Sequence, residues 1–347
     1  MSTQRRRRSK RRAAWSIGIA ALIFLLLGGA AACLCLCPTQ TAETAYLYID
    51  QDDDLDSVAD KVAAIAQPKT MLAFQPMARA LGYDEHVRTG RYAVHPRESL
   101  LTLLRRLRNG EQTPVRLSVP VVRQWGELCR RLSQQLMLDS ATIAQALADS
   151  ATCALHGYTI HTIPAMFVPD TYEVYWDITL PRLLTRMERE HDLFWTHERL
   201  QQADSLGLTP CEVSTLASIV DSETANDAEK PTIAGLYLNR LRKGMLLQSD
   251  PTVIFAIGDF TIRRVLNEHL RTPSPYNTYL YKGLPPGPIR IPSIAGIEAV
   301  LHAQSHDYLY MCAKEDFSGT HNFAATYQQH LQNARRYTEA LNKRGIR

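Results

Sequence analysis

The sequence predicts an α+β protein with an apolar N-terminal helix, a small strand–helix–helix–strand region and a larger mixed α/β domain. Three observations predict it: residues 13–42 contain no charged side chain, residues 46–122 show short strand and helix patterns, and the remainder is richer in amphipathic helices joined by polar loops. A chain of 347 residues is long enough for two domains and a sizeable core.

A basic cluster occupies residues 1–12, which hold seven Arg and Lys residues and no acid. Subtracting these seven from the 39 Lys and Arg residues of the chain leaves 32, against 35 Asp and Glu residues. A nucleic-acid-binding face would need a positive excess in the folded part, so we expect no nucleic-acid partner. A cluster of this kind is also typical of a disordered tail, but an apolar run follows it directly. Residues 1–12 are therefore predicted to be a cytoplasmic basic tail.

The apolar run predicts a transmembrane helix at residues 13–37, followed by a linker at 38–45. About 20 apolar residues in a helix cross a bilayer core of about 30 Å. The preceding cations place the N-terminus in the cytoplasm and the body on the outer, periplasmic side of the inner membrane. Two alternatives stay open: a cleaved signal peptide, and a lipoprotein signal ending at Cys33, although Ala30 stands where Leu is usual. All three export the body.

The seven cysteines give no metal signature. Cys33, Cys35 and Cys37 lie at the outer end of the apolar run, where lipid contact or acylation competes with pairing. The remaining four are widely spaced and form no CxxC pair, namely Cys129, Cys153, Cys211 and Cys312. An oxidising compartment permits one or two disulfides among them, and buried free thiols are the alternative. No zinc, other metal or cofactor is implied.

The region 46–122 alternates short strand and helix patterns. We predict a strand, two helices, a strand and a third helix at Tyr46–Ile49, Leu55–Ile65, Thr70–Leu81, Arg91–Val94 and Arg97–Asn109. Gly110 ends the third helix, and the β-branched stretch Val115–Val122 predicts another strand. Strand, two helices and strand within some 50 residues is the size of a small LysM-like unit.

The domain predicted at 123–347 begins with helices at Gln124–Met137 and Ser140–Asp149. A proline-containing segment, Ile163–Trp176, leads into one long amphipathic helix, predicted at Leu180–Leu206. Thr209 then opens a further helix with the pattern of a capping box, because Pro210 follows at the first helical position and Glu212 stands at the third.

The helix after Thr209 directs one acid toward the core. Its apolar residues recur at helical spacing, at Val213, Leu216, Ala217 and Val220. Three residues further along the same stripe lies Glu223, whereas Asp221 points elsewhere. A carboxyl group that loses hydration has a raised pKa and can donate a proton near neutral pH. The alternative is a Glu at a fraying helix end that faces water or pairs with an Arg.

A second helix is predicted at Ala228–Lys243, with Asp227 as its N-cap and Gly244 as its end. Polar side chains then gather in loops, namely Gln248, Asp250, Thr252, Tyr276, Asn277, Thr278 and Tyr279. A stiff Gly- and Pro-rich loop follows at Gly283–Pro288. Amide and aromatic side chains on stiff loops suit sugar binding. A rigid surface crossover is the alternative for any one of these loops.

Several blocks of the sequence resemble the endolytic murein transglycosylases, called MltG or YceG-like proteins. The blocks occur in the family's order, at Phe167–Glu173, Leu216–Thr224, Asn239–Met245, Leu247–Thr252, Pro275–Tyr279, Gly283–Ile289 and Gly319–Phe323. The apolar helix and the LysM-like region also fit the family's architecture. The resemblance implies a YceG-like catalytic domain whose catalytic acid corresponds to Glu223.

The resemblance further implies a lytic transglycosylase, which is a carbon–oxygen lyase. It would cut the bond between N-acetylmuramic acid and N-acetylglucosamine inside a peptidoglycan strand and leave a 1,6-anhydro end. Many members carry Glu where this chain has Asp221. The shorter side chain would withdraw a carboxyl group by about 1.5 Å, one C–C bond, which would spoil proton transfer. Asp at this position therefore agrees with Glu223 as the acid.

The family's pattern extends to further residues that would bind the sugar: Gln248, Asp250, Asn277, Tyr279 and His321, with Glu173 as a possible second carboxylate in the cleft. A structural hydrogen bond that holds a loop is the alternative for each. A non-catalytic peptidoglycan-binding or division scaffold and a hydrolytic muramidase are the competing functions. A tethered enzyme would meet new glycan at the membrane, so we expect it to trim or terminate nascent strands beside peptidoglycan synthases.

Overall fold

The computed structural model describes residues 15–26, 28–29, 32–33, 36, 43–66 and 68–345. The predicted basic tail, residues 1–12, lies outside them, as do parts of the predicted membrane segment at 13–37 and of the linker at 38–45. Residues 15–26 are helical. Among the helices in the described ranges, none combines the length and the apolar character that crossing a bilayer requires.

The described chain folds into two compact units. The first unit comprises residues up to Val115 together with Glu173–Asp177, and the second comprises Arg116–Tyr172 and the chain from Ile178 onward. The predicted domains divide after residue 122 and are each continuous. In the structure the chain leaves the first unit seven residues earlier and a five-residue segment returns to it.

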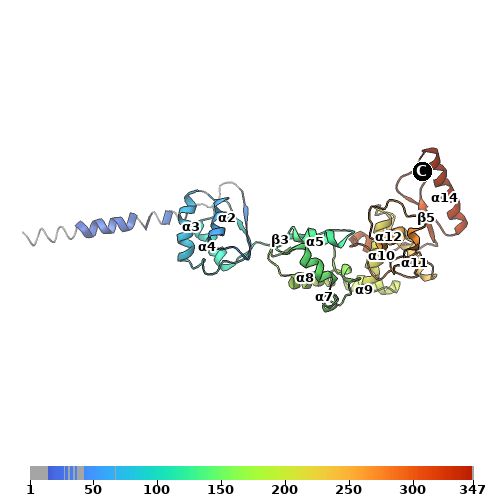
Figure 1. Ribbon diagram of the computed structural model, residues 1–347, viewed down its shortest axis with the longest axis horizontal. Helices are drawn as coiled ribbons and strands as arrows, with labels where there is room; N and C mark the ends of the chain where they lie inside the picture. The colour runs from blue at the N-terminus through green and yellow to red at the C-terminus, as the bar shows by residue number, and fades with distance from the viewer. Residues whose placement is uncertain are drawn as a thin grey trace, which may run out of the picture. The chain divides into compact units, whose positions relative to one another are not determined.

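The first unit has the predicted order of strand, two helices, strand and helix. Its elements are β1 (Ala45–Ile49), α2 (Leu55–Ala63), α3 (Pro68–Ala80), β2 (Gly90–Val94) and α4 (Leu100–Asn109). The strands pair antiparallel, with Leu47 opposite Tyr92. Figure 1 shows α2, α3 and α4 grouped together beside this hairpin. As predicted, Gly110 ends α4 in the left-handed conformation, at φ 71°.

A single apolar core holds this unit together. Alternate residues of β1, Leu47 and Ile49, are buried, while Tyr46 and Tyr48 face solvent. The helices contribute buried residues at helical spacing, for example Leu100, Leu103, Leu104 and Leu107 of α4. One face of the hairpin and one stripe of each helix are thus removed from water together, which is the arrangement that stabilises two layers.

The second unit begins with strand β3 (Val115–Val119), which pairs with β4 (Asp170–Val174); the division between the units falls within these two strands. Between them lie the short helices α5 (Trp125–Ser133), α6 (Ser140–Ala148), α7 (Ser150–Leu155) and the 3-10 turn η1 (Ile163–Met166). The predicted helices near Gln124–Met137 and Ser140–Asp149 are confirmed, although α5 ends four residues early. The strand β4 is not predicted from the sequence.

The predicted single helix Leu180–Leu206 is wrong. The structure has two helices, α8 (Leu180–Phe194) and α9 (His197–Leu206). The break occurs at Trp195, whose ψ of 70° is not helical, and Thr196 then caps α9 by accepting a hydrogen bond from the backbone N–H of Arg199. A Thr after a bulky aromatic residue can restart a helix because its hydroxyl satisfies a free N–H group.

Helix α10 (Pro210–Glu223) is the centre of the second unit. It packs against α9, α11 (Lys230–Arg242), α12 (Asp250–Ile257) and α13 (Ile294–Leu301), and Figure 1 shows α10, α11 and α12 side by side. The core formed by these helices is mainly aliphatic and includes Trp195, Tyr237 and Tyr276. A helix that neighbours enclose on nearly all sides can hold a polar side chain away from water at its end.

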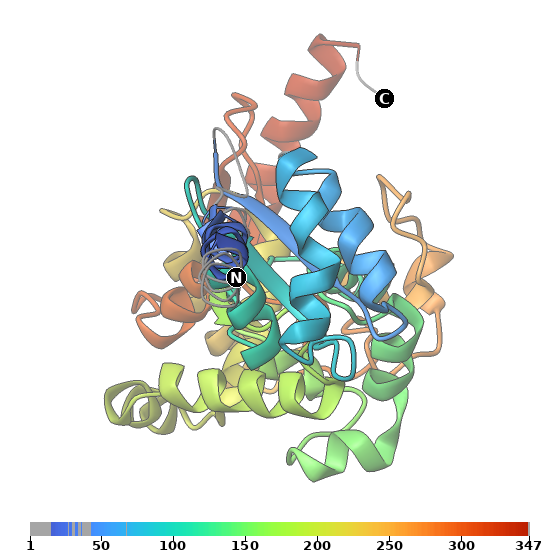
Figure 2. The same cartoon turned by 90° about the vertical axis from the view of Figure 1, so that its left-hand side faces the viewer.

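Two further features complete the unit. Strands β5 (Tyr310–Ala313) and β6 (His321–Ala324) form an antiparallel pair, against which the C-terminal helix α14 (Tyr327–Lys343) packs. Helix α14 lies at the margin of its unit in both views (Figure 1, Figure 2).

The N-cap predicted for α11 at Asp227 is wrong, because Glu229 occupies that position and Asp227 instead pairs with Lys230. Gly244 follows the helix at φ 61°.

Candidate active site

Glu223 is the last residue of α10, and the sequence signals for this helix are confirmed. Thr209 and Glu212 form the capping box, and Pro210 stands in the first turn. The predicted apolar stripe is fully buried, at Val213, Leu216, Ala217 and Val220. Thr224 leaves the helix in an extended conformation. Glu223 therefore projects from the end of a helix that its neighbours fix in place.

Two hydroxyl groups hold one oxygen of Glu223. The phenol of Tyr237 on α11 donates to Oε1 at 2.6 Å, and the hydroxyl of Ser249 donates to the same oxygen at 2.6 Å. Among the residues that the structure describes, none donates a hydrogen bond to Oε2. One oxygen is thus used for orientation, and the other is available to a ligand.

The surroundings of Glu223 raise its pKa above the ordinary Glu value. Burial is the largest cause, and the nearby negative charge of Asp250 adds to it. The hydrogen bonds from Ser249 and Tyr237 and the charge of His321 oppose this effect. The residue keeps partial solvent access, so its proton can exchange with a ligand. Glu223 has the environment of a general acid.

Two cavities meet at Glu223. The larger measures about 870 Å³ and the smaller about 240 Å³, and Glu223 and Asp250 line both. Residues of α12, of the loop that follows it and of α14 line the larger cavity, whereas α11, β5 and the loop before α12 contribute to the smaller one. A ligand that occupies both cavities would therefore pass Glu223.

A buried arginine fixes the loop that carries the polar residues of the smaller cavity. Arg240 on α11 donates to the carbonyl oxygens of Leu246 and Leu247 and to Oε1 of Gln248, at 3.1, 2.8 and 3.2 Å. Burial lowers the pKa of Arg240. Gln248 itself has a φ of 53°, which is unusual for a residue other than glycine. Local strain of this kind often accompanies a functional loop.

The structure brings four of the six predicted sugar-binding residues together with Glu223. Gln248, Asp250, Tyr279 and His321 all line the smaller cavity. The phenol of Tyr279 donates to Oδ1 of Asp250 at 2.6 Å. His321 is held by Glu229, which accepts its backbone N–H at 2.8 Å and lies 3.2 Å from Nδ1.

The other two predicted residues lie outside the lining of both cavities. Asn277 is fully buried. Its amide nitrogen donates to the carbonyl oxygens of Leu270 and Thr272, and its oxygen accepts from the backbone of Tyr279, so it holds the loop that presents Tyr279. Glu173 is an exposed residue of β4 and belongs to the first unit.

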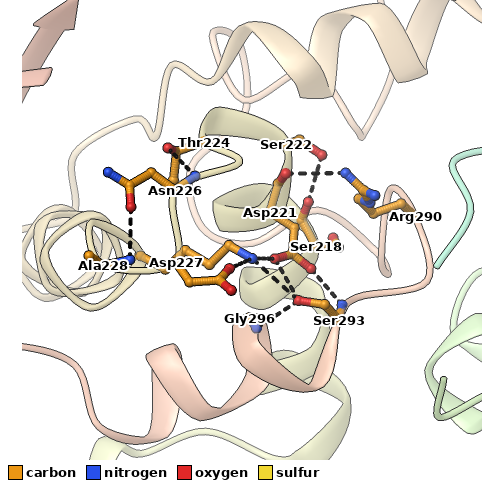
Figure 3. Close-up of polar contacts among 11 residues, drawn as sticks. Ser218, Asp221, Ser222, Thr224, Asn226, Asp227, Ala228, Arg290, Ser293 and Gly296 are labelled. Carbon is orange, nitrogen blue, oxygen red and sulfur yellow. Dashed lines mark hydrogen bonds and ion pairs between the residues drawn. The ribbon is translucent and has the colours of Figure 1, made fainter. Parts of the chain in front are cut away.

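Asp221 forms a polar cluster of its own (Figure 3) and, among the described residues, shares no partner with Glu223, which agrees with the prediction that it points elsewhere. Its carboxylate lies 2.7 Å from Lys230 Nζ and accepts hydrogen bonds from the backbone and the hydroxyl of Ser293, which caps α13. Arg290 donates to its backbone oxygen at 3.1 Å. A Cβ on Gly296 would lie only 2.6 Å from this carboxylate. Asp221 therefore joins α10 to α11 and α13 and plays no part in the two cavities.

Sequence reasoning did not identify the two residues that bind Glu223. Ser249 occupies the N-cap position of α12, but its hydroxyl accepts no capping hydrogen bond there and donates to Glu223. Tyr237 reads as a core residue, and the signal for its role is the phenol, which needs a partner when it is buried. The contribution of α14 to the larger cavity has no signal in the sequence pattern.

Comparisons with known proteins agree on one family. The sequence profile of the YceG-like family matches residues 47–336. A protein of Bacillus subtilis (strain 168) named endolytic murein transglycosylase is 40% identical over 130 residues, which is 38% of this chain and 35% of that protein. A protein of the same name from Streptococcus pneumoniae (strain R6) is 33% identical over 153 residues, or 42% of this chain and 27% of that protein. The chain thus aligns with about a third of the length of these relatives.

A solved structure supports the fold. The crystal structure of a yceG-like protein from Listeria monocytogenes superposes with a TM-score of 0.56 at 22% identity, covering 84% of this chain and 98% of that one. The mixed α/β YceG-like fold is thereby confirmed. The family profile covers more than four fifths of the sequence, in both compact units. The chain belongs to the YceG-like family.

Proposed function

We propose that this protein is an endolytic peptidoglycan lytic transglycosylase with Glu223 as its acid and base. The observation that carries the proposal is the position of Glu223, with a raised pKa and a free oxygen, where two cavities meet. Two cavities that share the acid in their lining give room for a long strand, which suits cleavage of a bond inside it. The name of the relatives from Bacillus and Streptococcus, endolytic murein transglycosylase, supports the same activity.

The reaction needs two proton transfers. Protonated Glu223 gives its proton from Oε2 to the glycosidic oxygen as the bond from that oxygen to C1 of the muramic sugar breaks. The 6-hydroxyl oxygen of the same sugar then bonds to C1, and its proton passes to the Glu223 carboxylate. The products are a free 4-hydroxyl group and a 1,6-anhydro sugar. Tyr237 and Ser249 keep the carboxyl group oriented through both proton transfers. Their hydrogen bonds stabilise the carboxylate that exists after the first transfer and before the second.

One carboxylate is sufficient for this reaction, because the attacking hydroxyl belongs to the substrate. A hydrolase usually needs a second carboxylate as base or nucleophile. Asp250 lines both cavities and is the one observation that favours a hydrolytic muramidase. Its Oδ1 already accepts the phenol of Tyr279, which suits a carboxylate that positions other groups. We therefore place the hydrolase second.

Digestion of purified peptidoglycan by the full chain tests the proposal. The products would be identified by mass spectrometry beside those of Glu223→Gln, which keeps the size of the side chain, and of Glu85→Gln, an exposed residue of the first unit that serves as a matched control. We expect anhydro-terminated fragments from the wild type and the Glu85 variant alone. Reducing ends would instead identify a hydrolase, and a folded protein that cuts nothing would favour a binding or scaffold role.

We also propose where the enzyme acts. The basic residues 1–12 and the uncharged run that follows support a single-pass anchor in the cytoplasmic membrane with the body outside. The antiparallel strand–helix–helix–strand order of the first unit supports a LysM-like module. Such a protein would trim or terminate nascent strands beside peptidoglycan synthases. Deleting it should lengthen glycan strands, and unchanged strand lengths would contradict this part of the proposal.

A further inference from the structure

The two cavities beside Glu223 differ in chemistry as well as in size. Polar and charged side chains, together with several apolar ones, line the smaller one, and Arg240 is its one arginine among the described residues. The larger one combines apolar walls with three arginines, which are Arg123, Arg263 and Arg264. Among the described residues that line it, Glu223 and Asp250 are the only acids, and both also line the smaller cavity. The charged side chains that line the larger cavity are therefore three cations and two anions.

These three arginines have no partner within the described part of the chain. None of them makes an ion pair or a side-chain hydrogen bond there, and all three are exposed. In contrast, the guanidinium groups of Arg106, Arg186 and Arg199 each pair with a carboxylate. Three cations from two segments of the chain thus line one cavity, and none of them pairs with either of its two acids, Glu223 and Asp250.

A fourth positive charge, Arg290, lies close enough to Arg123 to feel its charge. Burial lowers the pKa of Arg290, Asp221 opposes the effect, and the charge of Arg123 adds to the lowering. Arg290 Nε is buried and has no hydrogen-bond partner among the described residues. Mutual repulsion among arginines costs free energy unless an anion compensates it. The arrangement therefore suits an anionic ligand.

We infer that the larger cavity binds the peptide attached to the muramic sugar, and that its arginines pair with the carboxylates of that peptide. The inference rests on the proposed function. A guanidinium group binds a carboxylate through two parallel hydrogen bonds, which gives orientation as well as attraction. The apolar side chains between the arginines, such as Phe260 and Val265, suit the aliphatic parts of a peptide. The enzyme then selects strands whose peptides carry free carboxylates.

Binding of lipid-free glycan strands to the full chain tests this selection. The Glu223→Gln background prevents cleavage, and the Kd is measured for strands with free peptide carboxylates and for the same strands after those carboxylates are converted to amides. Amidation removes the charge and keeps the peptide. A lipid pyrophosphate on the strand would be a second anion that the arginines could bind. Both strands lack it, so a difference in Kd cannot come from that group. Exposed pairs are individually weak, so we expect the free-carboxylate strands to bind roughly three- to tenfold more tightly.

The arginine variants assign the preference to the cavity. Arg263→Gln with Arg264→Gln should bring the ratio of the two Kd values close to one, and Arg123→Gln, on a separate segment, should lower it by itself. Arg182→Gln with Arg189→Gln is the matched control, since both are exposed residues of α8 that line neither cavity, and it should keep the ratio. Salt should reduce the preference, because the Debye length falls from about 10 Å at about 0.1 M to about 3 Å at about 1 M.

Two results would overturn the inference. Equal Kd values for the two strands in the parent protein would show that the carboxylates are not recognised. A ratio that survives the loss of Arg263 and Arg264, and also the loss of Arg123, would place recognition elsewhere. Neither result touches the proposed function, which fails if the wild-type chain cuts no glycan or leaves reducing ends. Selection by the arginines together with absent cleavage would leave a peptide-binding cavity in a non-lytic protein.

Discussion

Replacing Lys230 by Met should destabilise the second unit more than any other single loss of charge that we predict here. The ammonium group of Lys230 lies 2.7 Å from Asp221, and their side chains are 8% and 2% exposed. Methionine has nearly the same shape and no charge. The substitution therefore leaves the carboxylate of Asp221 buried between α10 and α13 without its cation.

The expected loss follows from what remains around Asp221. Removing one partner of a buried ion pair typically costs about 3–5 kcal/mol. The backbone and the hydroxyl of Ser293 still donate to the carboxylate, at 2.6 and 2.9 Å. The second ion pair of Lys230, with Asp227, contributes little because Asp227 is 71% exposed. We therefore expect the low end of the range, a fall of about 3 kcal/mol in the free energy of unfolding.

Urea denaturation of the full chain, followed by circular dichroism and by tryptophan fluorescence, measures this loss. Trp195 reports on the second unit, because it is buried in the same core as α10. Lys243→Met is the control, since Lys243 is an exposed residue at the end of the same helix. The control should stay within about 0.5 kcal/mol of the wild type.

One outcome would refute the reasoning. If Lys230→Met and Lys243→Met have the same free energy of unfolding, the ion pair does not hold α10 to its neighbours. Where Lys230→Met does lose stability, the double variant Asp221→Asn with Lys230→Met tests the cause of that loss. It should recover part of the loss, because it removes the unpaired charge as well as its partner.

Three further predictions concern the site and the backbone. Glu223→Gln should lower cleavage by about 10²-fold or more. Because the pKa of Glu223 is raised in the folded protein, the wild type loses stability as pH rises from about 4 through that pKa. At neutral pH, Glu223→Gln should therefore unfold at a urea concentration equal to or higher than that of the wild type. Tyr237→Phe removes a hydrogen bond that lowers the pKa of Glu223, so the alkaline limb of the pH–rate profile should move to higher pH; an unmoved limb would contradict this. Gly287→Ala should lower the free energy of unfolding by about 2–3 kcal/mol, because its Cβ would lie 1.9 Å from the carbonyl oxygen of His161. Gly126→Ala on α5, where a Cβ meets open space, should raise it by about 0.5–1 kcal/mol. Thermal unfolding measures both changes.

The local signals in the sequence were sufficient to predict the helix that carries Glu223. Thr209, Pro210 and Glu212 act within one turn, and the apolar stripe repeats along the same helix. The first unit was predictable for the same reason, because its strands and helices are short and each has its own pattern. Where the interactions are local, composition and spacing are enough.

The partners of Glu223 could not be predicted in this way. Tyr237 is 14 residues further along the chain and Ser249 is 26, and they reach one oxygen only because α10, α11 and the loop before α12 pack together. The break between α8 and α9 fails for a related reason. Trp195 suits an amphipathic helix by its apolar character, but it packs into the tertiary core while Thr196 restarts the helix. Such contacts depend on the whole fold.

The two hydrogen bonds to Glu223 Oε1 determine when the protein becomes active. The acid belongs to α10, Tyr237 to α11 and Ser249 to a loop that Arg240 fastens to α11. An unfolded chain has none of these contacts, and its Glu223 titrates like any solvated glutamate. A proton donor of useful strength exists only after these segments have docked. For a protein that we propose to cut the wall around its own cell, newly made chains would thus remain inactive until folding is complete.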